Sequence, residues 1–170
     1  MGVHDARTMS KTYIGIDNGS TGTIGIIATD GVKFLETPVV ESLHYGKKGG
    51  LIKRLDRAAF KTLLAGINPV DAVVKIERPF TAGPMMINAM LHAHRFFEST
   101  ICTLEDMGFG YEVIDSGTWQ KPMLGDVKGS PELKKASKLR GIQLYPQFSD
   151  LIKKHGDADG ILISHFIATR

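Results

Sequence analysis

One short stretch, residues 13–27, constrains the fold of this chain more than any other, and it reads YIGIDNGSTGTIGII. An apolar run interleaved with glycine ends in Asp17, a small polar loop follows, and a second apolar run begins directly after that loop. Two β-branched runs joined by a glycine-bearing loop predict a pair of antiparallel strands. Because the first strand runs straight into an acid, Asp17 is a candidate site residue. The loop after it either holds a phosphate or simply turns the chain.

The rest of the chain alternates between strand and helix patterns. Residues 23–40 indicate two more strands with Asp30-Gly31 as the hairpin turn, so the chain opens as a three-stranded antiparallel meander. We expect loops at 41–52 and 116–130, strands at 71–77 and 110–116, and helices at 53–67, 85–107, 130–146 and 155–170. The order β-β-β-α-β-α-β-α-α predicts an α/β protein with a mixed five-stranded sheet flanked by helices. This is the element order of the ribonuclease H-like fold.

Length and composition exclude several classes of protein. The 170 residues suit one domain, which we place at residues 12–170, with residues 1–11 as a disordered leader or a vector remnant. No apolar run approaches the ~20 residues of a membrane span, and the first residues lack the apolar core of a secretion signal, so we expect a cytoplasmic protein. The only cysteine, Cys102, excludes an internal disulfide. It falls in an apolar helical pattern and is expected to be a buried, inert thiol.

Four acids fall where an α/β sheet places its ligands. Asp17 ends the first strand, Glu77 ends the fourth, and Asp157 and Asp159 begin the last expected helix. Ligand sites lie at the carboxyl ends of parallel strands, so Asp17 and Glu77 should face one point, with Asp159 above it. Carboxylates at such short separations repel one another, and a divalent cation between them relieves the repulsion. The alternative is that these acids cap helices or pair with lysines, which for Asp157 alone is an equally good interpretation.

The expected ligands indicate the metal and the reaction. Mg²⁺ and Mn²⁺ prefer hard oxygen ligands and leave positions open for water and phosphate. Two such ions ~3.5–4 Å apart clamp the attacking water and the leaving oxygen of a phosphodiester. We therefore expect two Mg²⁺ (or Mn²⁺) ions per active site and phosphoryl chemistry.

Basic residues gather beside the acids. The net charge of +3 permits a nucleic-acid partner without requiring one. Lysine and arginine cluster at 47–57, at 121–140 and at 153–154. Solvated helix faces explain any single cluster, but three clusters that border three acidic positions favour contact with phosphates. The expected DNA-binding residues are Lys47, Lys48, Lys53, Arg54, Lys121, Lys128, Lys134 and Lys135.

Four segments in order, GIDNGSTGTIGI, IERP, SGTWQKPM and HGDADGILIS, resemble the Holliday-junction resolvases of the RuvC type, and more closely their phage and organellar relatives. The resemblance covers residues 12–170. It implies a ribonuclease H-like fold, a homodimer, two divalent metals per subunit, and a crossover junction endodeoxyribonuclease that nicks four-way (Holliday) and other branched DNA. It also implies an intracellular protein, phage-encoded in a bacterial host or organellar.

The resemblance carries roles onto individual residues. Asp17 matches the first-strand acid of the family, Glu77 the fourth-strand acid and Asp159 the last-helix acid. Lys121 matches a lysine near the scissile phosphate. Lys134 matches a second basic residue at the start of a helix.

The fourth metal ligand is ambiguous. The family has an Asp or His three or four residues before the last acid, where this chain has Gly156 and His155, while Asp157 lies only two residues before it. At ~100° per helical residue, His155 and Asp159 share one face of a helix and Asp157 points almost oppositely. We therefore prefer His155 as the fourth ligand. An unwound first turn would let Asp157 reach the site instead.

A homodimer would use the long helix 85–107. A four-way junction has two-fold symmetry, and symmetric cutting needs two active sites. We expect Phe97, Ile101 and Leu104 to pack on the sheet. Met86, Met90 and the side of His94 would form a second stripe that meets its symmetry mate.

Three other functions compete with this interpretation. A similar opening occurs in actin-like and sugar-kinase ATPases, but these need a second such domain and a second phosphate loop, which this chain lacks. We therefore expect Gly19 and Gly22 to turn the chain and let DNA backbone approach, with no nucleotide cofactor. The second competitor is a catalytically idle DNA-binding dimer. The third is a ribonuclease H-like nuclease that acts on flaps or RNA-containing substrates. Sequence does not separate it from a junction nuclease, because such enzymes recognise the shape and backbone of the nucleic acid more than its bases.

Overall fold

The computed structural model describes residues 11–44, 49–79 and 87–170. Five strands form one mixed sheet in the order β3-β2-β1-β6-β7. The pairs β1–β2 and β2–β3 are antiparallel, whereas β1–β6 and β6–β7 are parallel. The strands are β1 (Thr12–Ile16), β2 (Thr23–Ala28), β3 (Gly31–Glu36), β6 (Ala72–Glu77) and β7 (Tyr111–Ile114). The predicted five-stranded mixed sheet and its opening meander are confirmed. Of the expected leader 1–11, residues 1–10 lie outside the described residues.

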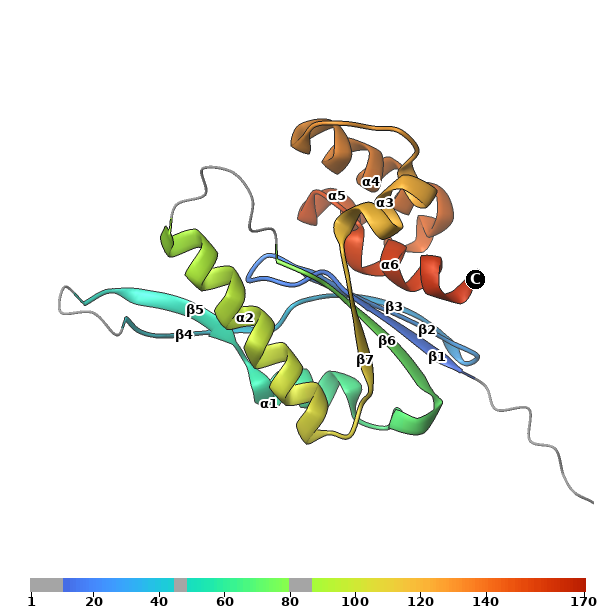
Figure 1. Ribbon diagram of the computed structural model, residues 1–170. Helices are drawn as coiled ribbons and strands as arrows, with labels where there is room; N and C mark the ends of the chain where they lie inside the picture. Colours follow the sequence, from blue (N-terminus) through green and yellow to red (C-terminus); the bar gives the residue numbers. More distant parts are fainter. Residues whose placement is uncertain (1–10, 45–48, 80–86) are drawn as a thin grey trace, which may run out of the picture.

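Helices cover both faces of the sheet (Figure 1). One face carries α1 (Arg57–Leu64) and α2 (Ile87–Asp106). The other carries α3 (Ser116–Leu124), α4 (Ser130–Leu144), α5 (Ser149–His155) and α6 (Asp159–Ala168). Two short 3-10 turns, η1 (Pro69–Asp71) and η2 (Pro146–Phe148), connect elements. Within the described ranges, no helix has the length and apolar character needed to cross a bilayer.

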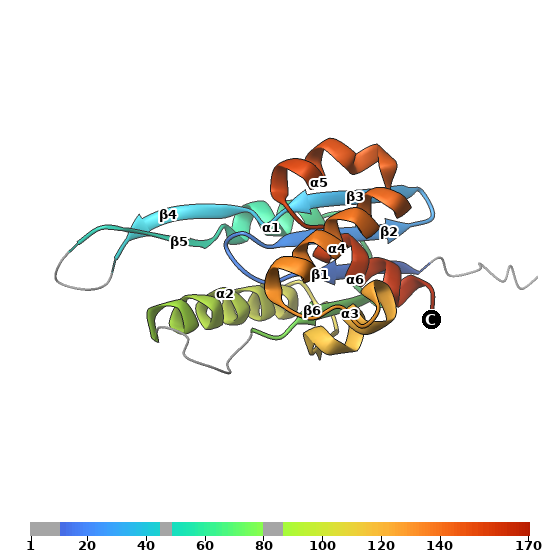
Figure 2. The same ribbon diagram turned by 90° about the horizontal axis from the view of Figure 1, so that it is seen from above.

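A two-stranded ribbon replaces the expected loop at 41–52. It consists of β4 (Val39–Leu43) and β5 (Leu51–Leu55), paired antiparallel, and it projects beyond the main sheet next to the start of α2 (Figures 1 and 2). Its side chains are mostly exposed, so the sequence shows no apolar alternation there. The helix expected at 53–67 therefore starts only at Arg57, where the Asp56 carboxylate accepts a hydrogen bond from Ala59 N at 3.0 Å.

The second half of the chain is more helical than expected. The loop expected at 116–130 contains α3, which includes Pro122. The helix α5 lies between the two last expected helices and was also missed. Both are short, and α3 buries only Trp119, so neither carries a long amphipathic pattern.

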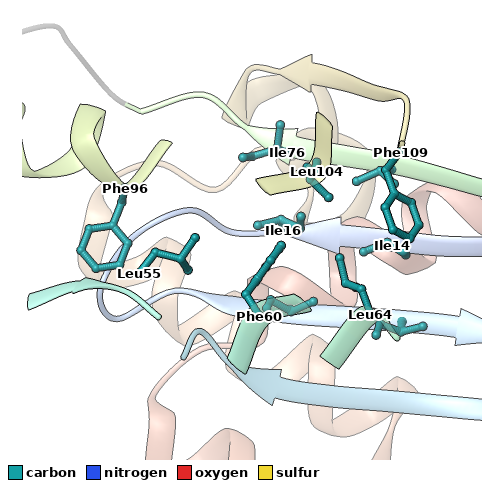
Figure 3. Close-up of a cluster of buried hydrophobic side chains, with 12 residues drawn as sticks. Ile14, Ile16, Leu55, Phe60, Leu64, Ile76, Phe96, Leu104 and Phe109 are labelled. Carbon is teal, nitrogen blue, oxygen red and sulfur yellow. The ribbon is translucent and has the colours of Figure 1, made fainter. Parts of the chain in front are cut away.

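Two apolar cores hold the layers together, one on each face of the sheet. Figure 3 shows the first, in which β1 and β6 residues pack against α1 and α2, among them Ile14, Phe60 and Phe96. The second gathers Trp119 and most of α6 against the opposite face. Cys102 lies outside both cores and is exposed, so the expectation of a buried thiol was wrong.

Glycines let α6 lie directly on the sheet. Gly15 and Gly25 are cross-strand partners in β1 and β2. A Cβ on Gly15 would stand 2.4 Å from Ser164 N, and one on Gly25 would stand 2.5 Å from Gly160 O. The Ser164 hydroxyl accepts from Gly15 N at 2.8 Å and donates to Gly25 O at 2.7 Å. Thr23 Oγ1 accepts from Gly160 N at 3.0 Å. The glycine-rich strand pattern thus fixes the first turn of α6 above the sheet.

Candidate metal centre

Carboxylates from distant parts of the chain meet at the carboxyl edge of the parallel strands. Asp17 follows β1 and Glu77 ends β6, and the parallel register puts the two acids at the same level. Asp159 is the first residue of α6. One carboxylate oxygen from each of Asp17, Asp157 and Asp159 can be chosen so that all three lie within 4.8 Å of one another. These are hard oxygen donors of the kind that Mg²⁺ and Mn²⁺ prefer.

The helix expected over 155–170 is broken, so the geometric reason for preferring His155 over Asp157 is wrong. α5 ends at His155, Gly156 adopts a left-handed conformation at φ 107°, and α6 starts only at Asp159. Glycine takes this conformation without the strain that a side chain would add. Asp157 is 7% exposed and joins Asp17 and Asp159 in the cluster. His155 lies beside Asp157, with 3.5 Å between its Nε2 and Asp157 Oδ1.

Burial and mutual repulsion favour the protonated acids. Burial raises the pKa of Asp17 well above its usual value, and the charges of Asp159 and Glu77 raise it further. Burial, followed by the charge of Asp157, raises the pKa of Asp159 to about 7. Burial also raises the pKa of Glu77. The charge of Lys134 acts in the opposite direction on Asp17 and Asp159. A cation placed among these acids would remove the repulsion.

One oxygen of the cluster has no hydrogen-bond partner. Asp157 Oδ1 is buried and accepts no hydrogen bond from the described residues. His155 Nε2, 3.5 Å away, makes no hydrogen bond to it. A buried carboxylate oxygen without a hydrogen bond is costly unless a proton or a cation satisfies it. Together with the convergence of three carboxylates, this orphaned oxygen fits a divalent-cation site.

Two buried side chains hold the acids in place, and sequence analysis gave a role to neither. Trp119 is fully buried, and its Nε1 donates a hydrogen bond to Glu77 Oε2. Ser137 is 2% exposed; its hydroxyl donates to Asp159 Oδ1 and accepts from Ala158 N at 3.0 Å. Trp119 is the only tryptophan of the chain, which was the one available hint, but it stood in a segment expected to be a loop.

A cleft of about 450 Å³ opens beside the acids. Glu77 and Asp159 line it together with residues of α3 and α4. Lys134 is the basic residue of this lining, which agrees with its effect on the pKa of Asp17. The lining comprises Glu77, Ser116, Gln120, Ser130, Leu133, Lys134 and Asp159.

Lys121, the other lysine with an expected catalytic role, does not line this cleft. It borders a neighbouring depression with Lys128, and its Nζ lies 3.6 Å from Asp126 Oδ1 in an exposed ion pair. The two hollows share Gln120 and Leu133, so Lys121 remains on the same side of the molecule.

The other expected DNA-binding residues are spread over two elements. Lys135 is exposed on α4, next to Lys134. Lys53 and Arg54 are exposed on β5. Lys47 and Lys48 lie outside the described residues.

Comparison with known proteins identifies the fold. No protein-family model and no curated protein sequence matches the chain. Among solved structures, the chain is similar to "Thermus thermophilus RuvC structure", with 15% sequence identity, a TM-score of 0.53, and coverage of 93% of this chain and 95% of that chain. It is also similar to T. thermophilus RuvC in complex with a Holliday junction substrate, with 16% identity, a TM-score of 0.51, and coverage of 94% and 95%. At such identities the likeness speaks for the fold alone. The chain has the ribonuclease H-like fold of RuvC.

Proposed function

We propose that this chain is a metal-dependent endonuclease that nicks four-way and other branched DNA junctions. The observation that carries the proposal is the cluster of Asp17, Asp157 and Asp159, with carboxylate oxygens within 4.8 Å of one another. Beside the cluster lies a cleft that Lys134 lines. The RuvC fold supports it, because one of the similar structures holds a Holliday junction substrate.

Asp17, Asp157 and Asp159 would hold the metal, with Glu77 as a further ligand from β6. Two Mg²⁺ or Mn²⁺ ions bound there would activate a water and stabilise the leaving oxygen of a phosphodiester. The chain itself supplies the orientation. Trp119 holds the Glu77 carboxylate through its Nε1. The hydrogen bonds of Ser137 hold Asp159 at the start of α6.

The cleft would receive the sugar–phosphate backbone. Lys134 offers an ammonium group to a phosphate, and the side chains of Ser116, Gln120 and Ser130 offer hydrogen-bond donors. None of these contacts requires a particular base, which suits an enzyme that reads the shape of a junction. Lys121 would contact a more distant phosphate, because it borders the neighbouring depression.

Substrate selectivity is the test of this proposal. The full chain is incubated with Mg²⁺ and a labelled four-way junction, with a flap, a linear duplex and an RNA–DNA hybrid as parallel substrates. We expect nicking of the junction that a chelator abolishes. Faster cleavage of the flap or the hybrid would favour the alternative ribonuclease H-like nuclease, and binding without any cleavage would favour the idle DNA-binding dimer.

We also propose that two copies act together on one junction. α2 carries exposed apolar side chains at Ile87 and Leu91, 70% and 52% exposed, in line with the exposed His94. Met90 is half-buried, and Met86 lies outside the described residues. An exposed apolar stripe on a helix is a surface that a partner can cover. Because two symmetric cuts need two active sites, a second copy of this chain is the occupant we favour.

A further inference from the structure

A second hollow, which we call the turn pocket, lies on the other side of the carboxylates. It has a volume of about 290 Å³ and is bordered by the β1–β2 turn, the segment after β3, β5 and the end of α5. The cleft of the metal centre lies towards β6 and β7, whereas the turn pocket lies towards β2 and β3. Asp17, at the end of β1, therefore lies between the two hollows. Side chains that line the turn pocket include Ser20, Thr21, Thr37, Lys53, Lys154 and His155.

The wall nearest the metal centre is a rigid turn. Gly22 N donates to Gly19 O at 3.1 Å, and Thr37 N donates to Gly22 O at 2.9 Å. A Cβ on Gly22 would stand 2.1 Å from Asp17 O, so the turn packs directly on the backbone of the first site acid. The turn pocket and the metal centre therefore share one piece of backbone.

Two lysines from distant segments make the turn pocket cationic. Lys53 comes from β5 and has no ion-pair partner among the described residues. Lys154 Nζ lies 3.8 Å from Glu36 Oε1, with side chains that are 75% and 50% exposed. Such an exposed pair is weak, and Lys154 can exchange it for a phosphate. Two lysines against one acid favour an anion as the ligand.

A buried hydroxyl points to a missing ligand. Thr37 is 8% exposed, and its Oγ1 is buried with no hydrogen-bond partner among the described residues. Buried hydroxyls in folded proteins are almost always hydrogen-bonded. Ser20 and Thr21 add two more hydroxyl groups to the same pocket. Hydroxyl and ammonium donors together suit a phosphate group.

The turn pocket also touches the metal centre through a side chain. His155 lines the pocket, and its Nε2 lies 3.5 Å from Asp157 Oδ1. A ligand in the pocket would therefore sit one side chain away from a carboxylate of the cluster.

We infer that the turn pocket binds a backbone phosphate of the strand that is cut, next to the scissile phosphate. The strand runs from the cleft, over the carboxylates, to the turn pocket. This inference rests on the proposed nuclease function. Free inorganic phosphate has the same chemistry as the ligand, so the experiment separates the two sources.

The first measurement is the salt dependence of junction binding. Full-length K53Q/K154Q is compared with wild type and with K33Q/K61Q, a control that removes two lysines of β3 and α1 which do not line the turn pocket. Affinity for a labelled four-way junction is measured without divalent metal at several salt concentrations. Because both lysines contact one phosphate, the negative slope of log K against log salt should become shallower by about one in the pocket variant. Its affinity should fall roughly tenfold, while the control stays close to wild type.

The second measurement locates the phosphate. Single neutral methylphosphonates are placed at successive positions along the cut strand. A methylphosphonate at one position beside the scissile phosphate should weaken binding by wild type. The same substitution should have no further effect on K53Q/K154Q, because this variant has already lost the contact between the two lysines and that phosphate. Thr37→Val should weaken binding at that same position without lowering Tm, since it removes only an unpartnered hydroxyl.

Three outcomes would overturn the inference. One is a pocket variant with the salt slope of wild type. Another is a methylphosphonate scan in which no position is specific to the pocket. The third is a methylphosphonate scan in which no position affects binding, combined with a shift of the amide resonances of the β1–β2 turn when millimolar inorganic phosphate is added. That result would assign the pocket to free phosphate. If wild type still nicks the junction, only the turn pocket fails. If wild type neither binds nor nicks branched DNA, the proposed function fails with it.

Discussion

At the scale of the residue, the acid cluster makes the metal-free protein sensitive to pH. The pKa of Asp17 is raised, and that of Asp159 is raised to about 7, so the folded state retains protons that the unfolded state releases near pH ~4. Stability therefore falls as pH rises from about 4 to about 7, where the folded state binds more protons. Without metal, we expect a lower Tm at pH 8 than at pH 5.

The matched control for this effect is Asp159→Asn. It removes one charge of the cluster, so the Tm of the variant should rise relative to the Tm of wild type as pH increases. The difference should grow by roughly 2–4 °C per kcal/mol of relieved repulsion. Added Mg²⁺ should raise the Tm of wild type at pH 8 more than that of the variant. Calorimetry with and without chelator measures both. A Tm difference between the two proteins that does not change with pH would contradict the repulsion.

Trp119 belongs to the same scale, because it acts through one hydrogen bond. Trp119→Phe keeps most of the buried ring but removes the donor to Glu77 Oε2. We expect the concentration of Mg²⁺ that gives half-maximal cleavage to rise about 10–100-fold. The rate at saturating Mg²⁺ should change less, because the ligands themselves remain. Ser137→Ala should behave in the same way through Asp159. Unchanged Mg²⁺ dependence in both variants would show that these side chains only fill space.

At the scale of the element, the docking of α6 on the sheet positions the metal centre. Gly25→Ala would place a methyl group 2.5 Å from Gly160 O, where backbone must move. We expect a loss of several °C in Tm and weaker Mg²⁺ binding, because α6 carries Asp159. Gly31→Ala, with no atom within 4 Å of its Cβ but φ at 152°, is a control for the general effect of a glycine change in this sheet. Equal Mg²⁺ affinity in both variants would contradict the idea that the docking of α6 on the sheet positions the metal ligands.

This scale also shows where sequence reasoning ends. The five strands of the main sheet and the long helix α2 were predictable, because each carries a sustained apolar pattern. The positions of Asp17 and Glu77 followed from the parallel pairing of β1 with β6. The break at Gly156 was not predictable from helical spacing, since a left-handed glycine leaves no mark on the apolar period. It decides which of His155 and Asp157 faces the cluster. The ribbon β4–β5 was missed because its side chains are mostly exposed.

At the scale of the whole molecule, the exposed stripe of α2 predicts self-association. Ile87→Asp or Leu91→Asp should weaken a dimer, because each places a charge in an apolar interface. Light scattering at micromolar concentration should give about twice the chain mass of 18.6 kDa for wild type and a smaller mass for the variants. A wild-type protein that is monomeric both free and on junction DNA would rule the dimer out.

The most direct test of the central claim is the rate at which Asp17→Asn nicks a four-way junction in Mg²⁺. The substitution removes one metal-site charge and leaves the lysines of the cleft and of β5 in place. We expect the nicking rate to fall by at least about a hundredfold, because losing a ligand should exceed the ~10–100-fold effect of losing an outer-shell partner. Junction affinity without metal should stay near that of wild type, since binding depends on the phosphate contacts. Nicking by Asp17→Asn at the wild-type rate, with the same metal dependence, would contradict the account.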